Sequence, residues 1–304
     1  MPLNNQRAER QYTLEYRRLL TAIFNAENAW GEALQPIQIL DGVRENATAF
    51  VVKTNNTPVV IGYTNLPSGP PTNGYNTGAN VAFGTGTSNS NRFGPRTEIK
   101  YVNTDVPYDY TLAIHEGLDN FTVNEDMDFA VAERLEVQSQ AQTRWMNSRI
   151  GGFLGTKAGN PVTLGAINEA NIINAFSGLS AFYVNMEVTA PVDAFVDPNV
   201  FNILVKADLI TTDKNSTVNI DQGMIYYSFG FRIIRTPEQY FDADDVAYLV
   251  PRAIVIPFVG ISVARTISSE DFAGVALQAA AKGGTYVSDE NATAISAIRL
   301  DTTP

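Results

Sequence analysis

The sequence predicts an α+β fold, because residues that favour helices and residues that favour strands occupy separate stretches of the chain. Amphipathic helices are expected at 8–34 and 121–154, a strand-rich region at 47–64, and mostly strands after residue 218. A doubly wound sheet would instead alternate strand and helix along its length. With 304 residues and no internal repeat, the chain is long enough for one large domain or two ordinary ones.

The composition favours a protein that covers part of its surface with neighbours. Charged residues make up 17% of the chain and hydrophobic residues 44%, whereas a globular domain averages about a quarter charged residues. The net charge of −11 argues against a basic face that grips nucleic acid. The absence of cysteine excludes disulfides, thiolate metal sites and a cysteine nucleophile. Because there is no signal-peptide stretch and no apolar run of about 20 residues, we expect a soluble protein that is not exported.

The first half of the chain predicts a helix, an arm and a second helix. The helix at 8–34 should end at Pro36, and strands should follow at 49–52 and 59–63. Residues 65–97 are rich in Pro, Gly, Asn, Thr and Ser, so they cannot build a core of their own. Strand-forming residues lie on both sides of this segment, which indicates the tip of a long two-stranded arm, either disordered or ordered by a partner.

The helix at 121–154 is predicted to lie on a surface. Thr122 and Glu125 have capping-box spacing, and the body from Phe129 to Ile150 contains no proline or glycine. Gly151 and Gly152 are expected to end the helix. Its apolar positions are sparse, so we expect it to contact other chains as well as its own core.

Later residues predict a helical segment followed by strands. A broad apolar face indicates a helix at 168–188, and Val192–Val196 should be a short strand. Asp197 followed by Pro198 is typical of a helix start, here for the helix 199–207. Further strands are expected at 223–234, 246–250 and 253–263, and short strand-like pieces separated by glycines at 271–300.

Residues that could carry chemistry are few, and we predict no catalytic, cofactor or metal site. His115 is the single histidine, and no Gly-x-Ser-x-Gly motif accompanies it. Asp242, Asp244 and Asp245, with Asp221 and Glu238, could hold calcium, but they lack the EF-hand pattern, so a solvated turn is the better interpretation. The glycines around Gly84 are not followed by the Lys of a P-loop.

Charged residues suggest contacts between subunits. Arg92, Arg96 and Lys100 place positive charge along one side of the arm, and Glu133 and Glu136 place negative charge on the long helix. Exposed ion pairs contribute little individually, but they select partner and register. Simple solvation of these charges is the alternative.

Several stretches resemble a known family. Asp197–Lys206 (DPNVFNILVK), Gly230–Pro237 (GFRIIRTP), Asp245–Val250 (DVAYLV) and Phe272–Gln278 (FAGVALQ) are similar to segments of the major capsid proteins of tailed bacteriophages. The order of arm, hairpin, long helix and mixed domain is also similar over nearly the whole chain. The resemblance implies an HK97-like capsid fold with an N-terminal arm at 1–45, an extended β-hairpin loop at 46–112, a peripheral domain at 113–165 with the spine helix 121–154, an axial domain at 166–250, and returning axial and peripheral strands at 251–304.

The resemblance also implies a function. The chain would be a structural protein and not an enzyme, the major head protein of an icosahedral virion, assembled in the host cytoplasm from hexamers and pentamers around double-stranded DNA. Its partners would be other copies of itself, a separate scaffolding protein and a portal, with no membrane and no sequence-specific DNA contact. Trp30, in the arm that would cross an interface, joins the candidate intersubunit contacts. The alternatives are an encapsulin-like compartment, a β-rich tail or surface module, and a hydrolase that uses His115.

Overall fold

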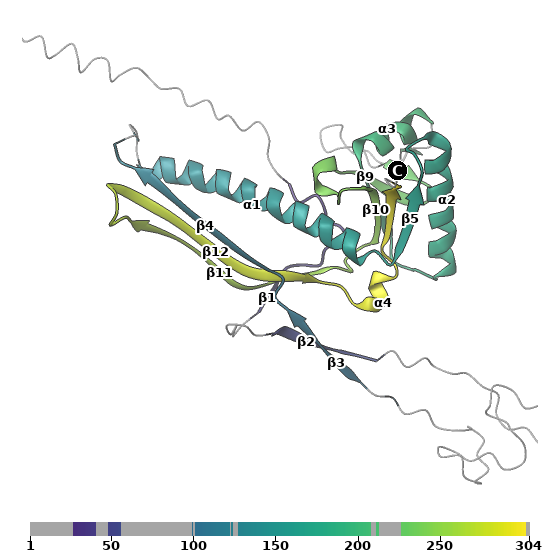
Figure 1. Ribbon diagram of the computed structural model, residues 1–304, viewed down its shortest axis with the longest axis horizontal. Coiled ribbons are helices and arrows are strands. Elements are labelled where there is room, and N and C mark those ends of the chain that lie inside the picture. Colours follow the sequence, from purple (N-terminus) through teal and green to yellow (C-terminus); the bar gives the residue numbers. More distant parts are fainter. Residues whose placement is uncertain are drawn as a thin grey trace, which may run out of the picture.

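The computed structural model describes residues 27–40, 48–55, 99, 101–121, 123, 127–207, 211–212 and 226–301. Figure 1 shows three parts: a body around a large sheet, a long narrow sheet covered by one helix, and a projecting hairpin. None of the helices in these ranges is both long and apolar enough to cross a membrane. The mixed content of separate sheets and helices confirms the predicted α+β class.

The body is a seven-stranded mixed sheet with two helices on one face. Its strand order is β5-β13-β10-β6-β9-β8-β7, with parallel pairs β5–β13 and β6–β9 and antiparallel pairs elsewhere. The strands and helices of this part are β5 (Asn160–Leu164), α2 (Glu169–Asn185), β6 (Val192–Val196), α3 (Pro198–Lys206), β7 (Thr211–Thr212), β8 (Tyr226–Ser228), β9 (Phe231–Arg235), the 3-10 helix η4 (Glu238–Tyr240), β10 (Asp245–Pro251) and β13 (Ser296–Leu300).

The central strand β10 is buried along its whole length because both faces of the sheet are covered. On one face, Ala247 and Leu249 join the apolar side of α2 and α3. On the other, Tyr248 and Val250 join a second core with Ile150 and Leu154 from the end of α1. The predicted start of α3 is confirmed: the Asp197 carboxylate accepts hydrogen bonds from the first backbone N–H groups, and Pro198 opens the helix.

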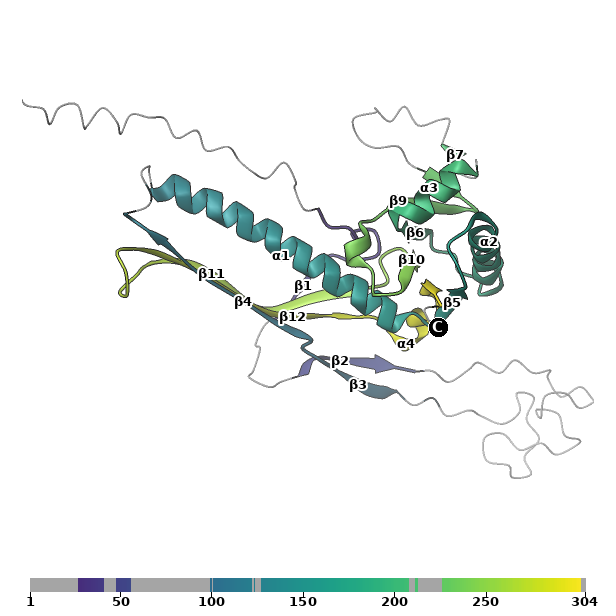
Figure 2. The same ribbon diagram turned by 45° about the horizontal axis from the view of Figure 1, so that its top comes forward.

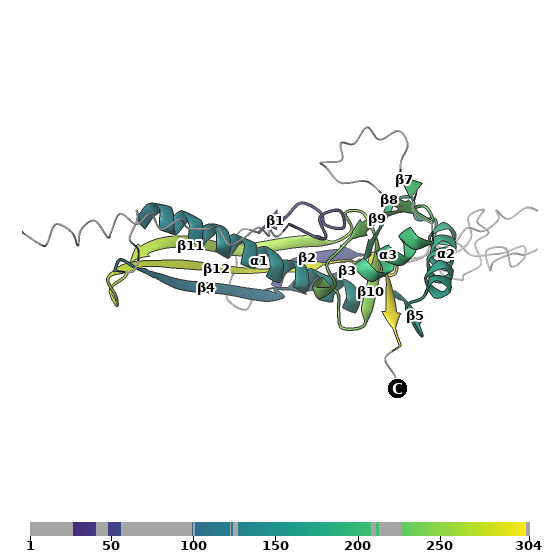
Figure 3. The same cartoon turned by 90° about the horizontal axis from the view of Figure 1, so that it is seen from above.

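The long sheet has four strands in the order β1-β11-β12-β4. Helix α1 lies along one face of this sheet (Figures 2 and 3). The β2–β3 hairpin projects from the opposite side of the sheet (Figure 1). The elements are β1 (Gln38–Ile39), β2 (Thr48–Thr54), β3 (Val102–Pro107), β4 (Tyr110–Asp119), α1 (Met127–Lys157), β11 (Ile256–Ser268), β12 (Gly274–Tyr286) and the one-turn helix α4 (Asp289–Ala292).

Two sequence-based expectations differ from the structure, and part of one lies outside the described residues. Residues 27–34 form turns and one β-bridge instead of a helix, because the Asn28 side chain accepts the Trp30 N–H and the chain then pairs with Val255. The pieces expected within 271–300 include one 13-residue strand, β12, since β11 and β4 pair with it on both sides. The N-terminal part of the helix predicted at 8–34, residues 8–26, lies outside the described residues.

Helix α1 does not end at its two adjacent glycines. It continues to Lys157, and Gly151 lies where the helix meets the backbone of η4. A Cβ at Gly151 would overlap the Tyr240 carbonyl oxygen, whereas a Cβ at Gly152 would have nothing within 4 Å. Gly151 is therefore a point of close approach, and its local cost to the helix is offset by the packing it allows.

We expect Gly151→Ala to lower the free energy of unfolding by about 2–4 kcal/mol, because the methyl group must displace the Tyr240 backbone. Gly152→Ala is the matched control, one residue away in the same helix, and should raise stability by up to about 1 kcal/mol. Urea unfolding of the two variants followed by circular dichroism measures both changes. Equal effects of the two substitutions would contradict this account of the glycine pair.

Candidate interaction surfaces

The segment 27–40 is fastened to the end of α1 by Trp30. The indole is fully buried, and its Nε1–H donates to the Asn147 carbonyl at 2.8 Å. The Asn147 side chain accepts from the Ala29 N–H at 3.1 Å and donates to the Glu27 carbonyl at 2.7 Å. Trp30 was expected to contact another subunit. The structure places its whole side chain inside its own chain, so we do not carry that expectation forward.

Ion pairs hold the same segment to the body. Glu32 pairs with Arg232 at 2.9 Å and lies 3.8 Å from Arg252. Arg252 also makes two hydrogen bonds to Asp193, at 2.6 and 2.9 Å. Because Asp193 is almost wholly buried, losing its arginine partner would leave an uncompensated charge. The point where segment 27–40 joins the body is therefore fixed.

The described part of the hairpin, in contrast, packs on the rest of the chain at its root. Phe50 of β2 packs edge-on against Phe258 and Tyr286 at ring-centroid distances of 5.1 and 5.7 Å. Farther out, Val51 and Val102 are exposed on opposite faces of the β2–β3 pair. An isolated two-stranded hairpin is marginally stable in water, so these faces are suited to cover by another chain.

Helix α1 contacts the long sheet through polar groups in its middle. Arg134 makes two 2.6 Å hydrogen bonds to Glu116 of β4, and Gln138 donates to the same carboxylate at 2.7 Å. These donors, Arg134 first, lower the pKa of Glu116 to about 2. The predicted thin apolar stripe agrees with this arrangement, because a polar cluster supplies the contact where apolar side chains are sparse.

Large apolar side chains are exposed at the end of the long sheet that lies away from the body. Phe121 follows β4 and is 83% exposed, and Phe129 begins α1 and is 58% exposed. Phe272, in the β11–β12 turn at the same end (Figures 1 and 3), is also exposed. We name these three residues the apolar end. A group of exposed aromatic residues of this kind is typical of a protein contact.

The charged residues expected at subunit contacts are only partly described. Glu136 is exposed on α1 and Glu133 is half-buried, while Arg92, Arg96 and Lys100 lie outside the described residues. The proposed pairing of these two groups stays a prediction.

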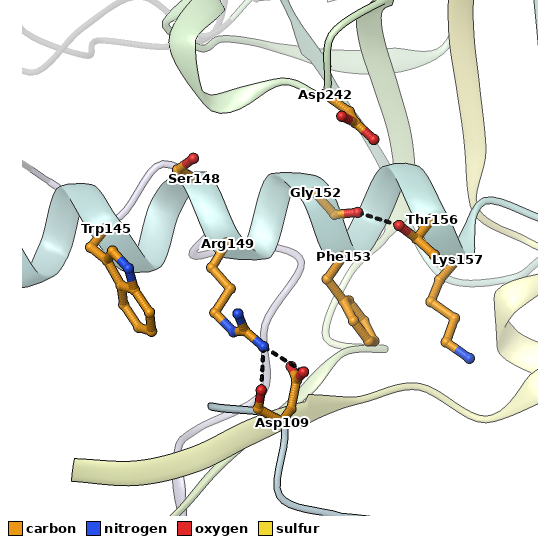
Figure 4. Close-up of a pocket in the computed structure, with 9 residues that line it drawn as sticks. All are labelled: Asp109, Trp145, Ser148, Arg149, Gly152, Phe153, Thr156, Lys157 and Asp242. Carbon is orange, nitrogen blue, oxygen red and sulfur yellow. Dashed lines mark hydrogen bonds and ion pairs between the residues drawn. The ribbon is translucent and has the colours of Figure 1, made fainter. Parts of the chain in front are cut away.

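Two neighbouring cavities lie where α1 approaches the start of β4. The first has a volume of about 550 Å³. In Figure 4, Trp145, Arg149, Phe153 and Lys157 project from one side of α1, as their four-residue spacing requires. Arg149 donates to both the carbonyl and the carboxylate of Asp109. Phe153, Lys157 and Asp109 also line the second cavity, of about 490 Å³, at the hairpin root.

Among the described residues, His115 and the aspartates near Asp245 have the following partners. His115 lies on β4 and its Nε2 is 3.3 Å from the Gln278 amide nitrogen. Asp245 is paired with Arg299 at 2.6 Å and accepts the Tyr248 hydroxyl at 2.7 Å. Asp221 falls in a range that the structure does not describe. Within the described ranges, no three His, Cys, Asp or Glu side chains gather as metal ligands would.

Comparison with known proteins gives matches among solved structures only. No protein-family model and no curated protein matches the chain. A chain from the asymmetric unit of the bacteriophage PhiM1 mature capsid is 13% identical, with a TM-score of 0.60 over 93% of this chain and 89% of its own. The chain has the fold of phage capsid proteins. The capsid structure of Cyanophage P-SCSP1u agrees, at 10% identity and TM-score 0.62 over 95% and 92%, as does Mycobacterium phage Adephagia, at 12% and 0.55 over 100% of both chains.

The phage capsid fold confirms the resemblance seen in the sequence.

Sequence reasoning did not single out Glu116 with its two donors, because Arg134 and Gln138 lie 18 and 22 residues from Glu116 in the chain. It also missed the acidic residues at the hairpin root. Asp289 and Glu290 directly follow the N-cap Ser288, a signal that identifies the helix start but not the cavity beside it.

The cluster around Glu116 should make the free energy of unfolding depend on pH in the acidic range. The carboxyl pKa falls from about 4.5 to about 2 on folding, so the cluster stabilises the chain above pH 4.5, and this contribution is lost as the pH falls towards 2. Glu116→Gln should cost about 1 kcal/mol at pH 7, a small value because the pair is partly exposed, and should flatten the loss of stability between pH 4.5 and 2. Glu136→Gln, on the open face of α1, is the control. An unchanged pH profile of unfolding in Glu116→Gln would contradict the assignment.

Proposed function

We propose that this chain is the major capsid protein of a tailed bacteriophage and assembles into an icosahedral shell that encloses double-stranded DNA. The observation that carries the proposal is the phage capsid fold, which extends over almost the whole chain. The exposed apolar end and the exposed hairpin faces support it, because both are surfaces that neighbouring copies would bury.

Assembly in this proposal is driven by burial between copies. The arm at 1–45, the hairpin loop at 46–112 and the helix at 121–154 supply contacts, while the axial region at 166–250 and the strands at 251–304 supply the folded body. Contacts between unlike surfaces close into rings when the rotation between copies is right, and hexamers and pentamers are such rings. Arg92, Arg96 and Lys100 of one copy would meet carboxylates of another, with Glu133 and Glu136 among the candidates.

The negative net charge suits a capsid shell that encloses DNA without binding it tightly. With a net charge of −11, the shell would repel phosphates and would make no sequence-specific contact. We infer that a separate scaffolding protein and a portal take part, that assembly occurs in the host cytoplasm, and that the role is structural, without a catalytic or cofactor-dependent step.

The proposal is tested by negative-stain microscopy and size-exclusion chromatography of the expressed chain. The chain is studied alone and with a co-expressed scaffolding protein from the same phage. We expect closed particles of uniform size. A compact monomer or small oligomer under all conditions would contradict it and favour a tail or surface module. Particles that copurify with one enzyme as cargo would favour an encapsulin-like compartment.

Deleting residues 65–97 and joining the ends with a short Gly-Ser linker should leave a folded chain that no longer forms shells. The deleted segment lacks the apolar residues of a core, so we expect thermal unfolding within a few degrees of the full chain. Circular dichroism checks the fold, and sedimentation of particles checks assembly. Normal particles from the deletion variant would show that the arm tip is not a subunit contact.

A further inference from the structure

Three polar side chains cross the long sheet side by side on the face that α1 does not cover. Gln278 of β12 lies opposite His115 of β4 on one side and opposite Arg265 of β11 on the other. Glu116 faces α1, where Arg134 binds it, and successive side chains of a strand point to opposite faces. His115 therefore lies on the open face, on the side from which the hairpin projects (Figure 1). We call Arg265, Gln278 and His115 the polar row.

The hydrogen bonds of the polar row run in one direction. The Arg265 Nε–H donates to the Gln278 Oε1 at 2.8 Å. Because a guanidinium has only donors, the amide oxygen of Gln278 must face Arg265, and the amide NH₂ must then face His115. The amide nitrogen lies 3.3 Å from the His115 Nε2. An amide NH₂ only donates, so this ring nitrogen must accept, and the ring proton must be on Nδ1.

We propose that the polar row is a pH-sensitive contact, a chain of hydrogen bonds that exists only while His115 is neutral. An imidazole ordinarily takes up a proton between pH 5 and 8, and the imidazolium donates from both of its nitrogens. Two donors would then face each other between Gln278 and His115. If the amide turned to offer its oxygen to the ring, its NH₂ would face Arg265 instead. Protonation therefore breaks one of the two hydrogen bonds whichever way the amide points.

The charged groups on the same face do not replace Gln278 as a partner of the ring. Lys282 of β12 is a cation and lies over an aromatic ring at 4.9 Å. Asp119 is four residues from His115, about 13 Å along the strand, and its carboxylate already accepts a backbone N–H. Arg265, within the row, is also a cation. A proton on His115 thus adds a second positive charge to the row.

The charged groups on the other elements are bound or lie at the end of the sheet. Glu116, next to His115 in the sequence, is on the α1 face and pairs with Arg134 at 2.6 Å. Glu270 and Asp271 belong to the turn between β11 and β12. His115 forms no ion pair with any residue in the described ranges. The imidazolium therefore gains no carboxylate in exchange for the hydrogen bond that it loses.

The position of the ring proton is the first test, and the single histidine of the chain makes its signals unambiguous. Nitrogen NMR of the full chain with ¹⁵N-labelled histidine, in the solid state if the chain forms particles, distinguishes the two neutral tautomers. At pH 8 we expect the proton on Nδ1, whereas a free imidazole prefers it on Nε2. Gln278→Ala should restore the preference of the free ring. An Nε2–H tautomer in the wild type, or an unchanged tautomer in Gln278→Ala, would overturn the proposal.

Arg265→Ala tests whether the chain of hydrogen bonds starts at the guanidinium. Without Arg265, the Gln278 amide is free to turn its oxygen towards the ring, so the Nε2–H tautomer should appear at pH 8. A residue that only packed beside Gln278 would not move the proton. Retention of the Nδ1–H tautomer alone in this variant would contradict the directed chain.

The dependence on pH is tested by a double-mutant cycle of His115→Ala and Gln278→Ala, with urea unfolding followed by circular dichroism. The contact stabilises the chain when His115 is neutral, so its contribution is present at pH 8 and lost as the pH falls to 5. We expect a coupling of about two- to fivefold in the unfolding equilibrium constant at pH 8 and none at pH 5. Equal coupling at the two pH values would overturn the pH sensitivity.

Two further variants complete the test. In Gln278→Glu the carboxylate can accept from both Arg265 and the imidazolium, so its coupling to His115 should persist at pH 5. The control pairs His115→Ala with Gln142→Ala, because Gln142 belongs to α1 on the opposite face. This pair should show no coupling at either pH. Loss of the Gln278→Glu coupling at pH 5, or coupling in the control, would count against the polar row as the source of the effect.

Discussion

The junction between the end of α1 and the seven-stranded sheet is the packing on which the rest of the structure depends. Gly151 lets the helix touch the backbone of η4, and Trp30 fills the space between Ile150, Phe195 and Tyr248. The indole and the Asn147 side chain then bind the incoming chain to the helix. One site therefore sets the angle of the long helix, the path of segment 27–40 and the position of the sheet.

Along α1, the number of buried apolar side chains falls with distance from this junction. The apolar contacts of α1 are concentrated near Ile150 and Leu154, and the Glu116 cluster holds its middle. At the far end Phe121 and Phe129 are exposed. A fold with one well-packed body and thinly covered extensions is stable as a subunit and still retains apolar surface that assembly can bury.

Local signals in the sequence predicted local structure well. Asp197 caps the N-terminus of α3 and Pro198 is its first residue, as the sequence predicts. The apolar face of α2 lies in the core, as the spacing of its apolar residues predicts. The failures have a shared cause in distant contacts. A pair of glycines often marks the end of a helix, but here Gly151 admits the backbone of Tyr240. Glycines 274, 283 and 284 read as breaks in β12, yet the rings of Phe272, Tyr110 and Phe258 pack onto them. Likewise, Trp30 shows helical spacing, but its partner Asn147 lies 117 residues away.

In the proposed assembly, exposed charge would let copies select their neighbours without binding them too tightly. An exposed ion pair contributes little free energy, so such contacts would form and break while copies find their register. The exposed apolar end and the exposed faces of the hairpin lie on different elements of each copy. Contacts between unlike surfaces are heterologous, and repetition of a heterologous contact builds rings and shells from one chain.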